Sequence, residues 1–558
     1  MNEHDYTDPN APVNVSFFLK ENAAKFPYKR AVVYPEYHDK NGRVAYTHLT
    51  FRQLERESDR IAAGLVKAGV TRGTRTILMV RQSLDFFALT FALFKAGAVP
   101  VVVDPGMGIK RMLNCMREGK PEAFIGIPLA HVLRTVYPKF FSTVKTFVTV
   151  GKKYFWGGPT LKEIRANAPL VHKTANTGRD ETAAILFTSG STGPAKGVVY
   201  THGMFDAQIR QIRSYFSIGE DEIDLPTFPL FALFDPALGM TAIIPDMDPT
   251  KPALVNPEKI IEAIINHGVT NMFASPALLN RVGRYGKSKG LKLQSLKRVV
   301  SAGAPVLPSN IEQFSAILTK DAEIQTPYGA TEAVPIISIS SREILSETKV
   351  LSEKGFGTCV GRPINDTEIQ IIKISDDPIE TWSDDLLVPE NEIGEIVVKS
   401  PLASRNYYEK PEHDAAHKIK DGHDVFHRMG DLGWRDNKGR IWFCGRKSHR
   451  VITEKEILYT IPCEAIFNAH PAVFRSALVG IGEPGFQEPI ICIEIEANQK
   501  PSKKTLRKEL LEMAEQNILT KEIKTVLFHK SFPVDIRHNS KIFREKLAVW
   551  AENKLTKG

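Results

Sequence analysis

Cysteine is scarce in this sequence. The chain of 558 residues has five cysteines, scattered and odd in number: Cys115, Cys359, Cys444, Cys463 and Cys492. No two of them form a Cys-x-x-Cys pair, so the pattern suggests neither a zinc site nor a disulfide framework. We expect them to be small buried apolar residues of a protein in a reducing compartment.

Long apolar runs are also absent. The most apolar stretch, residues 86–103, is interrupted by Lys95, Gly97 and Pro100. It therefore predicts a buried helix followed by a strand, and no transmembrane segment. Residues 1–12 are polar and acidic, unlike a signal peptide. We expect a cytoplasmic protein; these features leave peripheral attachment to a membrane open.

Neither sign of charge dominates. Lys and Arg number 73 against 64 Asp and Glu, a net charge of +9, and no dense basic block occurs. This excess suits an anionic ligand or a membrane surface, but it is spread too thinly to predict a nucleic-acid partner. Internal repeats, low-complexity segments and Pro/Gly-rich linkers are missing as well. The length of 558 residues is nevertheless too great for a single core.

Strands and helices alternate in the first half of the chain. Thr50 is positioned to cap a helix that includes residues 58–69, and Ser83 to cap a helix that runs to Lys95 and is stopped by Gly97. Short apolar strands are expected at residues 76–80, 99–103, 183–187, 271–274 and 298–301. The order strand, helix, strand predicts parallel units of an α/β sheet.

The pattern changes after residue 360. Strands are expected at residues 368–374, 395–399, 440–444, 476–480 and 490–496, and helices at residues 505–517 and from Ile542 onward. The composition of the chain does not mark a domain boundary, so the boundary is predicted from the positions of the motifs. Residues 1–445 are predicted to form one domain, and residues 446–558 a second one of a size typical for a compact domain.

The strongest local signal is a loop rich in glycine and hydroxyl side chains. It follows an apolar strand and reads Leu186-Phe187-Thr188-Ser189-Gly190-Ser191-Thr192-Gly193-Pro194-Ala195-Lys196-Gly197. Glycines let a backbone approach an anion closely, and backbone N–H groups, hydroxyls and a lysine can hold a polyphosphate. The Gly-x-x-x-x-Gly-Lys-Ser/Thr order of a Walker A loop is absent. A flexible surface turn is the weaker alternative for this segment taken alone.

Four further segments carry polar or small residues suited to a nucleotide. Tyr328-Gly329-Ala330-Thr331-Glu332 combines an aromatic face, a hydroxyl and a carboxylate that suits Mg²⁺. Ser301-Ala302-Gly303-Ala304-Pro305 offers a flat wall for a base, Asp431 suits ribose hydroxyls, and Gly445-Arg446-Lys447 adds a second cationic turn. Taken singly, each segment is better explained as an ordinary turn.

In this order the motifs resemble the adenylate-forming superfamily of acyl-CoA synthetases, peptide-synthetase adenylation domains and luciferases. The resemblance extends from Thr50 to Leu547. It implies a reaction in which ATP converts a carboxylic acid into its acyl-AMP with loss of pyrophosphate. It also implies an α/β fold: a large N-terminal domain with parallel-rich sheets and a β-rich subdomain, and a small, mobile α+β C-terminal domain. Lys541 matches the family's mobile lysine, which lies between the α-phosphate and the acyl carboxylate.

The resemblance implies roles for particular positions. Catalytic roles would fall to Lys541, Glu332, Thr188 and Lys196, with Glu332 also binding Mg²⁺. The nucleotide would be held by Thr188, Ser189, Gly190, Ser191, Thr192, Gly193, Lys196, Gly303, Ala304, Pro305, Tyr328, Gly329, Ala330, Thr331, Asp431 and Arg446. Lysines and Mg²⁺ would offset the repulsion between the carboxylate and the phosphates and stabilise the charge of the transition state.

Several positions depart from the acyl-CoA ligases. Ala232 stands where those enzymes usually carry a histidine, within an apolar segment whose implied acyl-pocket residues are Phe231, Ala232, Phe234 and Asp235. Ser448 replaces the usual Asp or Lys of the hinge, and residues 446–456 contain no glycine where those ligases have a glycine-rich loop near CoA. The approach to Lys541 lacks the customary Gly-Lys pair. These changes argue against a CoA-dependent second step.

The same departures resemble one branch, the olefin β-lactone synthetases of long-chain hydrocarbon biosynthesis. Ile244-Pro245-Asp246-Met247-Asp248-Pro249-Thr250 and Phe532-Pro533-Val534-Asp535-Ile536-Arg537-His538-Asn539 are among the matching segments. The resemblance implies a 2-alkyl-3-hydroxy fatty acid, whose own 3-hydroxyl displaces AMP and closes a β-lactone; such an intramolecular attack recruits no second reactant. The base for the hydroxyl proton is left open among His449, His538 and Asp235. By analogy with the pathway, a lactone decarboxylase and a ketoacid reductase are expected partners.

Two other functions stay open. One is a long-chain fatty acyl-CoA ligase or fatty acyl-AMP ligase on the same fold. The other is a binding module that holds a nucleotide without turnover, which the presence of both Lys541 and Glu332 disfavours. The segment Gly480-Ile481-Gly482-Glu483-Pro484-Gly485 matches Gly-x-Gly-x-x-Gly. Because Pro484 and the strand expected at residues 490–496 leave no helix for a pyrophosphate, we expect no dinucleotide site there.

Overall fold

Local signals set the ends of the first helices. The computed structural model describes residues 11–169, 171–187, 195–228, 232–496, 499, 501–534 and 542–556. Thr50 begins α2 (Phe51–Lys67) with a capping box that it shares with Gln53. Ser83 caps α3 (Leu84–Ala96), and Gly97 ends it at φ 69°, a left-handed conformation that glycine adopts without steric cost. Both predicted caps are confirmed.

A six-stranded sheet contains the first predicted strand–helix–strand unit. Its order is β6-β5-β3-β4-β7-β8. Its members are β3 (Arg75–Met79), β4 (Val99–Val103), β5 (Ala123–Gly126), β6 (Thr146–Thr149), β7 (Thr182–Phe187) and β8 (Gly197–Thr201). β3 and β4 are parallel, which confirms the predicted unit, whereas β8 at the edge is antiparallel to β7. The loop with the strongest phosphate-binding signal therefore joins two paired strands.

A seven-stranded sheet lies beside it, in the order β13-β12-β11-β9-β10-β1-β2. Its members are β1 (Arg30–His38), β2 (Val44–Thr50), β9 (Ile223–Pro226), β10 (Thr241–Ile243), β11 (Asn271–Ala274), β12 (Arg298–Ser301) and β13 (Glu323–Gln325). The strands from β13 to β1 are parallel, and β2 closes the edge as an antiparallel partner of β1. The strands predicted at residues 271–274 and 298–301 are confirmed with those bounds.

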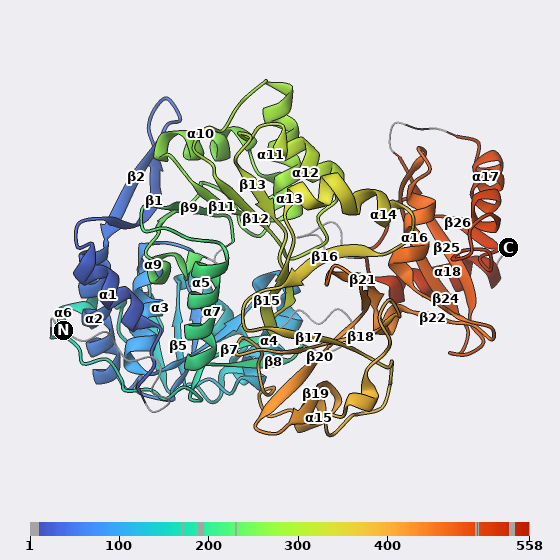
Figure 1. Cartoon of the computed structure of the whole chain (residues 1–558). Helices are drawn as coiled ribbons and strands as arrows, with labels where there is room; N and C mark the ends of the chain where they lie inside the picture. The colour runs from blue at the N-terminus through green and yellow to red at the C-terminus, as the bar shows by residue number, and fades with distance from the viewer. Residues whose placement is uncertain are drawn as a thin grey trace.

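The strands expected at residues 368–374, 395–399 and 440–444 belong to an antiparallel sheet. Its order is β14-β15-β16-β21-β20-β18-β17, with β19 paired to β20. Its members are β14 (Tyr328–Ala330), β15 (Ala333–Ser338), β16 (Thr358–Pro363), β17 (Glu368–Ile372), β18 (Gly394–Lys399), β19 (Lys418–Asp421), β20 (Asp424–Arg435) and β21 (Ile441–Arg446). In Figure 1 this sheet lies between the two parallel-rich sheets and the C-terminal elements.

The last elements gather at one end of the molecule, drawn in orange and red in Figure 1. They are β22 (Val451–Ile452), β23 (Ile457–Leu458), α16 (Thr460–Asn468), β24 (Val473–Ile481), β25 (Glu488–Ile495), α17 (Lys503–Glu515), β26 (Thr525–Phe528) and α18 (Arg544–Thr556). Arg544 Nη2 lies 2.7 Å from Oε2 of the buried Glu464, a pair whose disruption typically costs about 3–5 kcal/mol. β24 and β25 form an antiparallel hairpin, so no helix follows the Gly-x-Gly-x-x-Gly segment, as predicted.

Gly445 lies where these C-terminal elements meet the antiparallel sheet. Its φ is 124°, and a Cβ added there would overlap Thr460 Oγ1 at the start of α16. The position thus needs glycine both for its backbone conformation and for the close approach. The division into domains of residues 1–445 and 446–558 stays a prediction. The contact between Gly445 and Thr460 lies at the predicted boundary.

The remaining helices pack around the sheets (Figure 1). They are α1 (Ser16–Lys25), α4 (Ile109–Glu118), α5 (Pro128–Val136), α6 (Leu161–Ala166), α7 (His202–Tyr215), α9 (Asp235–Leu238), α10 (Pro257–His267), α11 (Pro276–Ser288), α12 (Pro308–Ser315), α13 (Ser341–Glu343), α14 (Lys349–Glu353) and α15 (Pro411–His417). All five cysteines are buried and unpaired, as expected.

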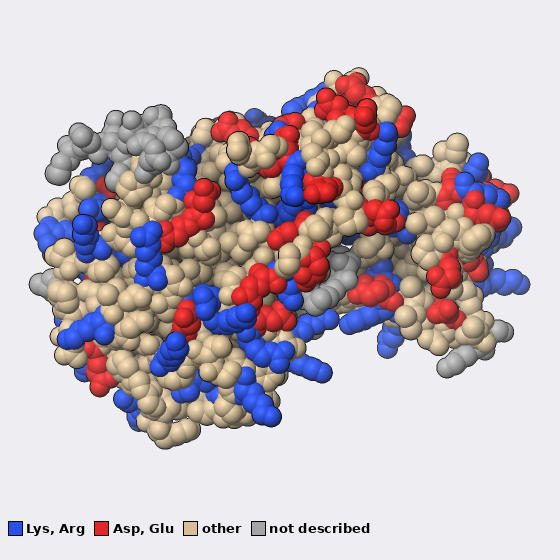
Figure 2. Space-filling model, turned by 90° about the horizontal axis from the view of Figure 1, so that it is seen from below, with Lys and Arg blue, Asp and Glu red and all other residues tan. Residues whose placement is uncertain are grey.

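In the described ranges, no helix is long and apolar enough to cross a membrane. Figure 2 shows basic and acidic side chains interspersed over one face.

Candidate active site

Two of the predicted nucleotide-binding side chains, those of Tyr328 and Arg446, converge on the carboxylate of a third, Asp431. Tyr328 Oη donates a hydrogen bond of 2.5 Å to Asp431 Oδ2, and Arg446 Nε lies 3.1 Å from Asp431 Oδ1. The pairing of β20 with β21 sets Asp431 opposite Arg446, whereas Tyr328 comes from β14. Burial, together with the negative charge of Asp431, raises the pKa of Tyr328 well above its usual range. The phenol is therefore a permanent donor, and Asp431 is held in place as a buried acceptor, which suits ribose hydroxyls.

The glycines and small residues predicted for the adenine site come from two segments that follow neighbouring strands. Gly329 has room for nothing larger than hydrogen, because an added Cβ would lie 2.5 Å from Ala333 O. Gly303 has φ 92° and, with Ala304 and Pro305, follows the carboxyl end of β12. Since β12 and β13 are parallel neighbours and Tyr328 comes soon after β13, both segments leave the sheet at the same edge. This topology brings the two predicted walls of the adenine site to one side of the molecule.

The predicted phosphate residues Lys196 and Glu332 are linked through a tyrosine. Tyr407 Oη donates a hydrogen bond of 2.8 Å to Glu332 Oε1, and Lys196 Nζ lies 5.2 Å from the centroid of the Tyr407 ring. Tyr200 Oη in β8 donates to the carbonyl oxygen of Thr331 at 2.5 Å. The strand after the phosphate loop and the turn that carries Thr331 and Glu332 are thus fastened together.

Sequence reasoning missed three members of this cluster: Tyr407, His417 and Lys418. Lys196 Nζ lies 2.9 Å from His417 Nε2; because an ammonium only donates, the ring nitrogen is the acceptor. Burial and the charge of Lys196 lower the pKa of His417 to about 3, so this imidazole is neutral at physiological pH. The one available signal was the repetition of histidine four residues apart, at His413 and His417, which places both rings on one side of a helix turn.

Lys418 brings a second ammonium group to the same aromatic ring. Its Nζ lies 5.4 Å from the centroid of Tyr407 and donates to the carbonyl oxygen of Ser404. Burial lowers its pKa to about 8, against the opposing effect of Glu332. Two lysines therefore flank Tyr407 while its hydroxyl holds Glu332, and Asp414 is a second carboxylate in the cluster, accepting a hydrogen bond of 2.7 Å from the Tyr407 backbone N–H.

Of the predicted acyl-pocket residues that the structure describes, Ala232 and Asp235 are buried and Phe234 is half-buried. Ala232 is fully buried, and Phe234 packs 5.8 Å from Phe205, ring centroid to ring centroid. The carboxyl group of Asp235 faces that of Asp224, and burial together with this neighbouring charge raises the pKa of Asp235 well above its usual range. A carboxyl that keeps its proton is a poor base, so this contact disfavours Asp235 as the acceptor of a hydroxyl proton.

Several predicted site residues lie outside the described residues: Thr188, Ser189, Gly190, Ser191, Thr192, Gly193, Phe231 and Lys541, and with them the candidate base His538. The described residues that flank Lys541 are anchored. Val534 and Ile542 form an antiparallel bridge, and Arg544 begins α18 with its contact to Glu464. The candidate base His449 lies in the 3-10 turn Lys447–His449 that follows β21.

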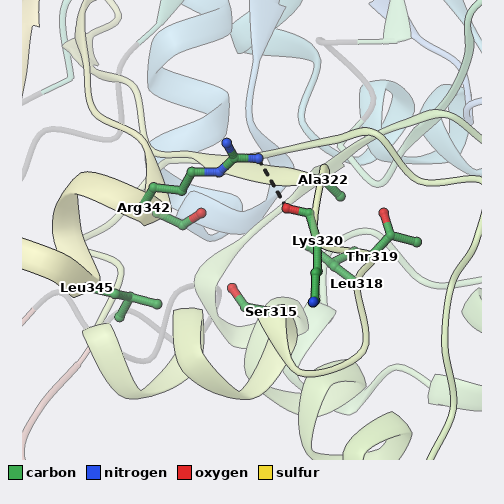
Figure 3. Close-up of a pocket in the computed structure, with 8 residues that line it drawn as sticks. Ser315, Leu318, Thr319, Lys320, Ala322, Arg342 and Leu345 are labelled. Carbon is green, nitrogen blue, oxygen red and sulfur yellow. Dashed lines mark hydrogen bonds between the residues drawn. The ribbon is translucent and has the colours of Figure 1, made fainter.

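A cavity of about 220 Å³ lies elsewhere, between the end of α12 and α13. Two of its lining residues are joined by a hydrogen bond of 3.2 Å, which Arg342 Nη2 donates to Lys320 O (Figure 3). Its lining residues are Ser315, Leu318, Thr319, Lys320, Ala322, Ser341, Arg342 and Leu345. None of the predicted nucleotide or acyl residues belongs to it, so it does not define the candidate active site.

Comparison with known proteins identifies the family and the fold. A family model described as AMP-binding enzyme matches residues 19–408, and the chain belongs to that family of adenylate-forming enzymes. A solved anthranilate CoA ligase in complex with anthranoyl-AMP has the same fold, with a TM-score of 0.78 at 18% identity over 99% of both chains.

Two curated relatives place the chain more narrowly. An olefin beta-lactone synthetase of Stenotrophomonas maltophilia is 46% identical over 556 residues, covering 98% of this chain and 100% of the relative. Another, from Xanthomonas campestris pv. campestris, is 45% identical over 546 residues, or 96% and 97% of the two chains. Within the AMP-binding enzymes, the chain groups with the olefin β-lactone synthetases, as the sequence motifs indicated.

Proposed function

We propose that this chain uses ATP to activate a long-chain 2-alkyl-3-hydroxy fatty acid and closes it to a β-lactone, releasing AMP and pyrophosphate. The 46% identity to an olefin β-lactone synthetase over nearly the whole chain carries the proposal. The buried Ala232, in place of the histidine usual in acyl-CoA ligases, and the hinge without a glycine-rich loop support it.

In the first step, a carboxylate oxygen of the acid bonds to the α-phosphorus of ATP and pyrophosphate leaves. Lys196, beside neutral His417, would hold the phosphates, and Lys541 would offset the charge that develops between carboxylate and phosphate. Asp431 would accept hydrogen bonds from the ribose. The two lysines would place positive charge beside the phosphates, and Asp431 would place a hydrogen-bond acceptor beside the ribose. The protein would therefore act mainly by positioning and by electrostatic stabilisation.

Glu332 fits a magnesium site completed by the substrate. Within the described ranges, no three His, Cys, Asp or Glu side chains are arranged to hold a metal ion. Mg²⁺ is commonly held by one or two carboxylates together with phosphate oxygens, and Glu332 would supply such a carboxylate, fixed by Tyr407 at 2.8 Å. When bound, Mg²⁺ would supply positive charge that stabilises the phosphates during transfer.

In the second step, the 3-hydroxyl oxygen bonds to the carbonyl carbon of the acyl-AMP and AMP leaves with the electron pair of the broken bond. The hydroxyl proton passes to a base. Because Asp235 holds its own proton in the core, His449 and His538 are the better candidates among the three predicted residues. Attack from within the same molecule needs no thiol channel.

The decisive experiment supplies a 2-alkyl-3-hydroxy fatty acid and ATP, with and without CoA. Mass spectrometry should show a product lighter than the acid by one water, at the same yield in both reactions. A thioester that forms only with CoA and retains a free 3-hydroxyl would establish the acyl-CoA ligase alternative instead. The absence of pyrophosphate release with every acid tested would establish a binding module.

We extend the proposal to a cytoplasmic location and to association with the enzymes that supply the hydroxy acid and consume the lactone, a ketoacid reductase and a lactone decarboxylase. Direct transfer would keep a poorly soluble product out of water. Co-purification of the three natural proteins at matched concentrations would test this association, and separate elution of each protein would contradict it.

A further inference from the structure

Helix α5 exposes an apolar stripe to solvent. Leu129, Val132 and Val136 are 69%, 41% and 61% exposed, and their spacing of three and four residues puts them on one face of the helix. The opposite face is buried through Ala130 and His131. A surface helix normally points its apolar face inward, and a second apolar face toward solvent marks a site of interaction.

The loop after β6 adds two aromatic rings to the stripe. Phe155 and Tyr154 are 79% and 57% exposed. Between them and the core lies Trp156, which stacks on His131 of α5 at 5.2 Å between ring centroids and donates a hydrogen bond of 2.9 Å to Thr149. The exposed rings therefore stand on an anchored base.

Sheet topology explains why the loop and the helix meet. β5 and β6 are parallel neighbours, with Gly126 opposite Thr149 at their carboxyl ends. α5 leaves β5 and the aromatic loop leaves β6 at that same edge. We call the combined surface the α5 patch: Leu129, Val132, Val136, Tyr137, Tyr154 and Phe155.

The chain segment that forms the α5 patch carries charge of one sign, and Glu163, just after the segment, is an acidic neighbour of Lys153. From residue 123 to residue 162 the chain has six Lys or Arg and no Asp or Glu. Lys152 and Lys153 are both exposed beside the aromatic rings, and Lys152 Nζ lies 5.3 Å from the centroid of Tyr154. The rest of the chain has the near balance of charge noted above, so this segment differs from it.

We propose that the α5 patch docks on the surface of an anionic phospholipid bilayer. Apolar and aromatic side chains enter the headgroup region, while lysines contact lipid phosphates. A protein partner would need an acidic surface to match forty residues without a carboxylate, whereas an anionic membrane offers negative charge everywhere. Docking goes beyond the proposed function and is argued independently of it. The proposed function explains only the advantage of docking, which is access to a long-chain acid dissolved in the bilayer.

The test is co-sedimentation of the full chain with vesicles, without ATP or acid. Vesicles of phosphatidylcholine mixed with phosphatidylglycerol should bind the protein, and vesicles of phosphatidylcholine alone should bind it more weakly. Lys152→Glu combined with Lys153→Glu should lower the partition coefficient about tenfold or more, since each basic residue near an anionic surface contributes markedly. Phe155→Ser should lower it about tenfold through lost apolar burial.

Matched controls come from the other end of the chain. Phe486 is 75% exposed, and Lys503 and Lys504 are adjacent exposed lysines, so Phe486→Ser and Lys503→Glu with Lys504→Glu should leave vesicle binding unchanged. Failure of the unmodified chain to sediment with anionic vesicles would overturn the inference, as would equal losses in test and control variants. Self-association abolished by Phe155→Ser without any vesicle binding would assign the patch to a protein interface and also overturn it. Lactone formation from a water-soluble acid is measured separately, so failure of the proposed function is distinguishable from failure of docking.

Discussion

Replacing Tyr407 by phenylalanine should slow adenylation while leaving the fold intact. The change removes one hydroxyl, which donates to Glu332 Oε1 at 2.8 Å from a side chain that is 3% exposed. A buried hydrogen bond to a charged group contributes about 1.5–3 kcal/mol. If Glu332 must be held for the first step, the rate should fall by about ten- to a hundredfold. Both lysines keep their aromatic neighbour, because the ring remains.

The assay is ATP–pyrophosphate exchange with a 3-hydroxy fatty acid, measured over a series of Mg²⁺ concentrations. A loosened Glu332 should raise the Mg²⁺ concentration needed for half-maximal exchange, which a purely structural defect would not do. Tyr408→Phe is the matched control: this neighbouring ring is half-buried and makes no hydroxyl hydrogen bond to the described residues. Exchange and Mg²⁺ dependence identical to those of the unmodified chain would refute the positioning role of Tyr407.

Three further predictions concern single side chains. Lys541→Ala should reduce the rate of pyrophosphate exchange by about 10²–10³, while ATP binding measured by calorimetry is retained. The control Lys546→Ala should leave the exchange rate unchanged. Retained exchange in Lys541→Ala would contradict the assignment. His417→Phe should raise the KM for ATP more than it lowers kcat, because Lys196 loses its acceptor at 2.9 Å. His417→Gln supplies another acceptor and should restore much of the affinity for ATP. Equal kinetics of the two variants would contradict a role for the Lys196–His417 contact. Burial lowers the pKa of His202 from 6.5 to about 4, so the unfolded chain takes up a proton first and about 3 kcal/mol of stability should be lost as pH falls from 6.5 to 4. Urea unfolding at neutral and mildly acidic pH should show a smaller loss in His202→Leu, and an identical loss would contradict this account.

Features with local causes could be predicted from the sequence. The cap at Ser83 and the stop at Gly97 depend on neighbours within four residues, and both were found where expected. The bounds of β11 and β12 also follow from short apolar runs between polar residues. Antiparallel β8 was not foreseen, because its pairing with β7 is set across the loop that contains Thr188 to Lys196 and not by any pattern within the strand.

The site shows where local reasoning ends. Tyr328 and Asp431 are 103 positions apart, and only the resemblance to a known family suggested that they share a ligand. Tyr407, His417 and Lys418 carry no motif beyond the repeated histidine. Their relation to Lys196 and Glu332 arises because the segment around Tyr407 pairs with β8. Hydrogen bonds between distant segments depend on the whole topology, which spacing along the chain does not encode.

The glycine at position 445 acts as a fixed point in the architecture. Any side chain there would meet Thr460 and push α16, with the small sheet behind it, away from the strand that carries Arg446. The absence of a side chain at this position thus sets how closely α16 can approach the strand that carries Arg446.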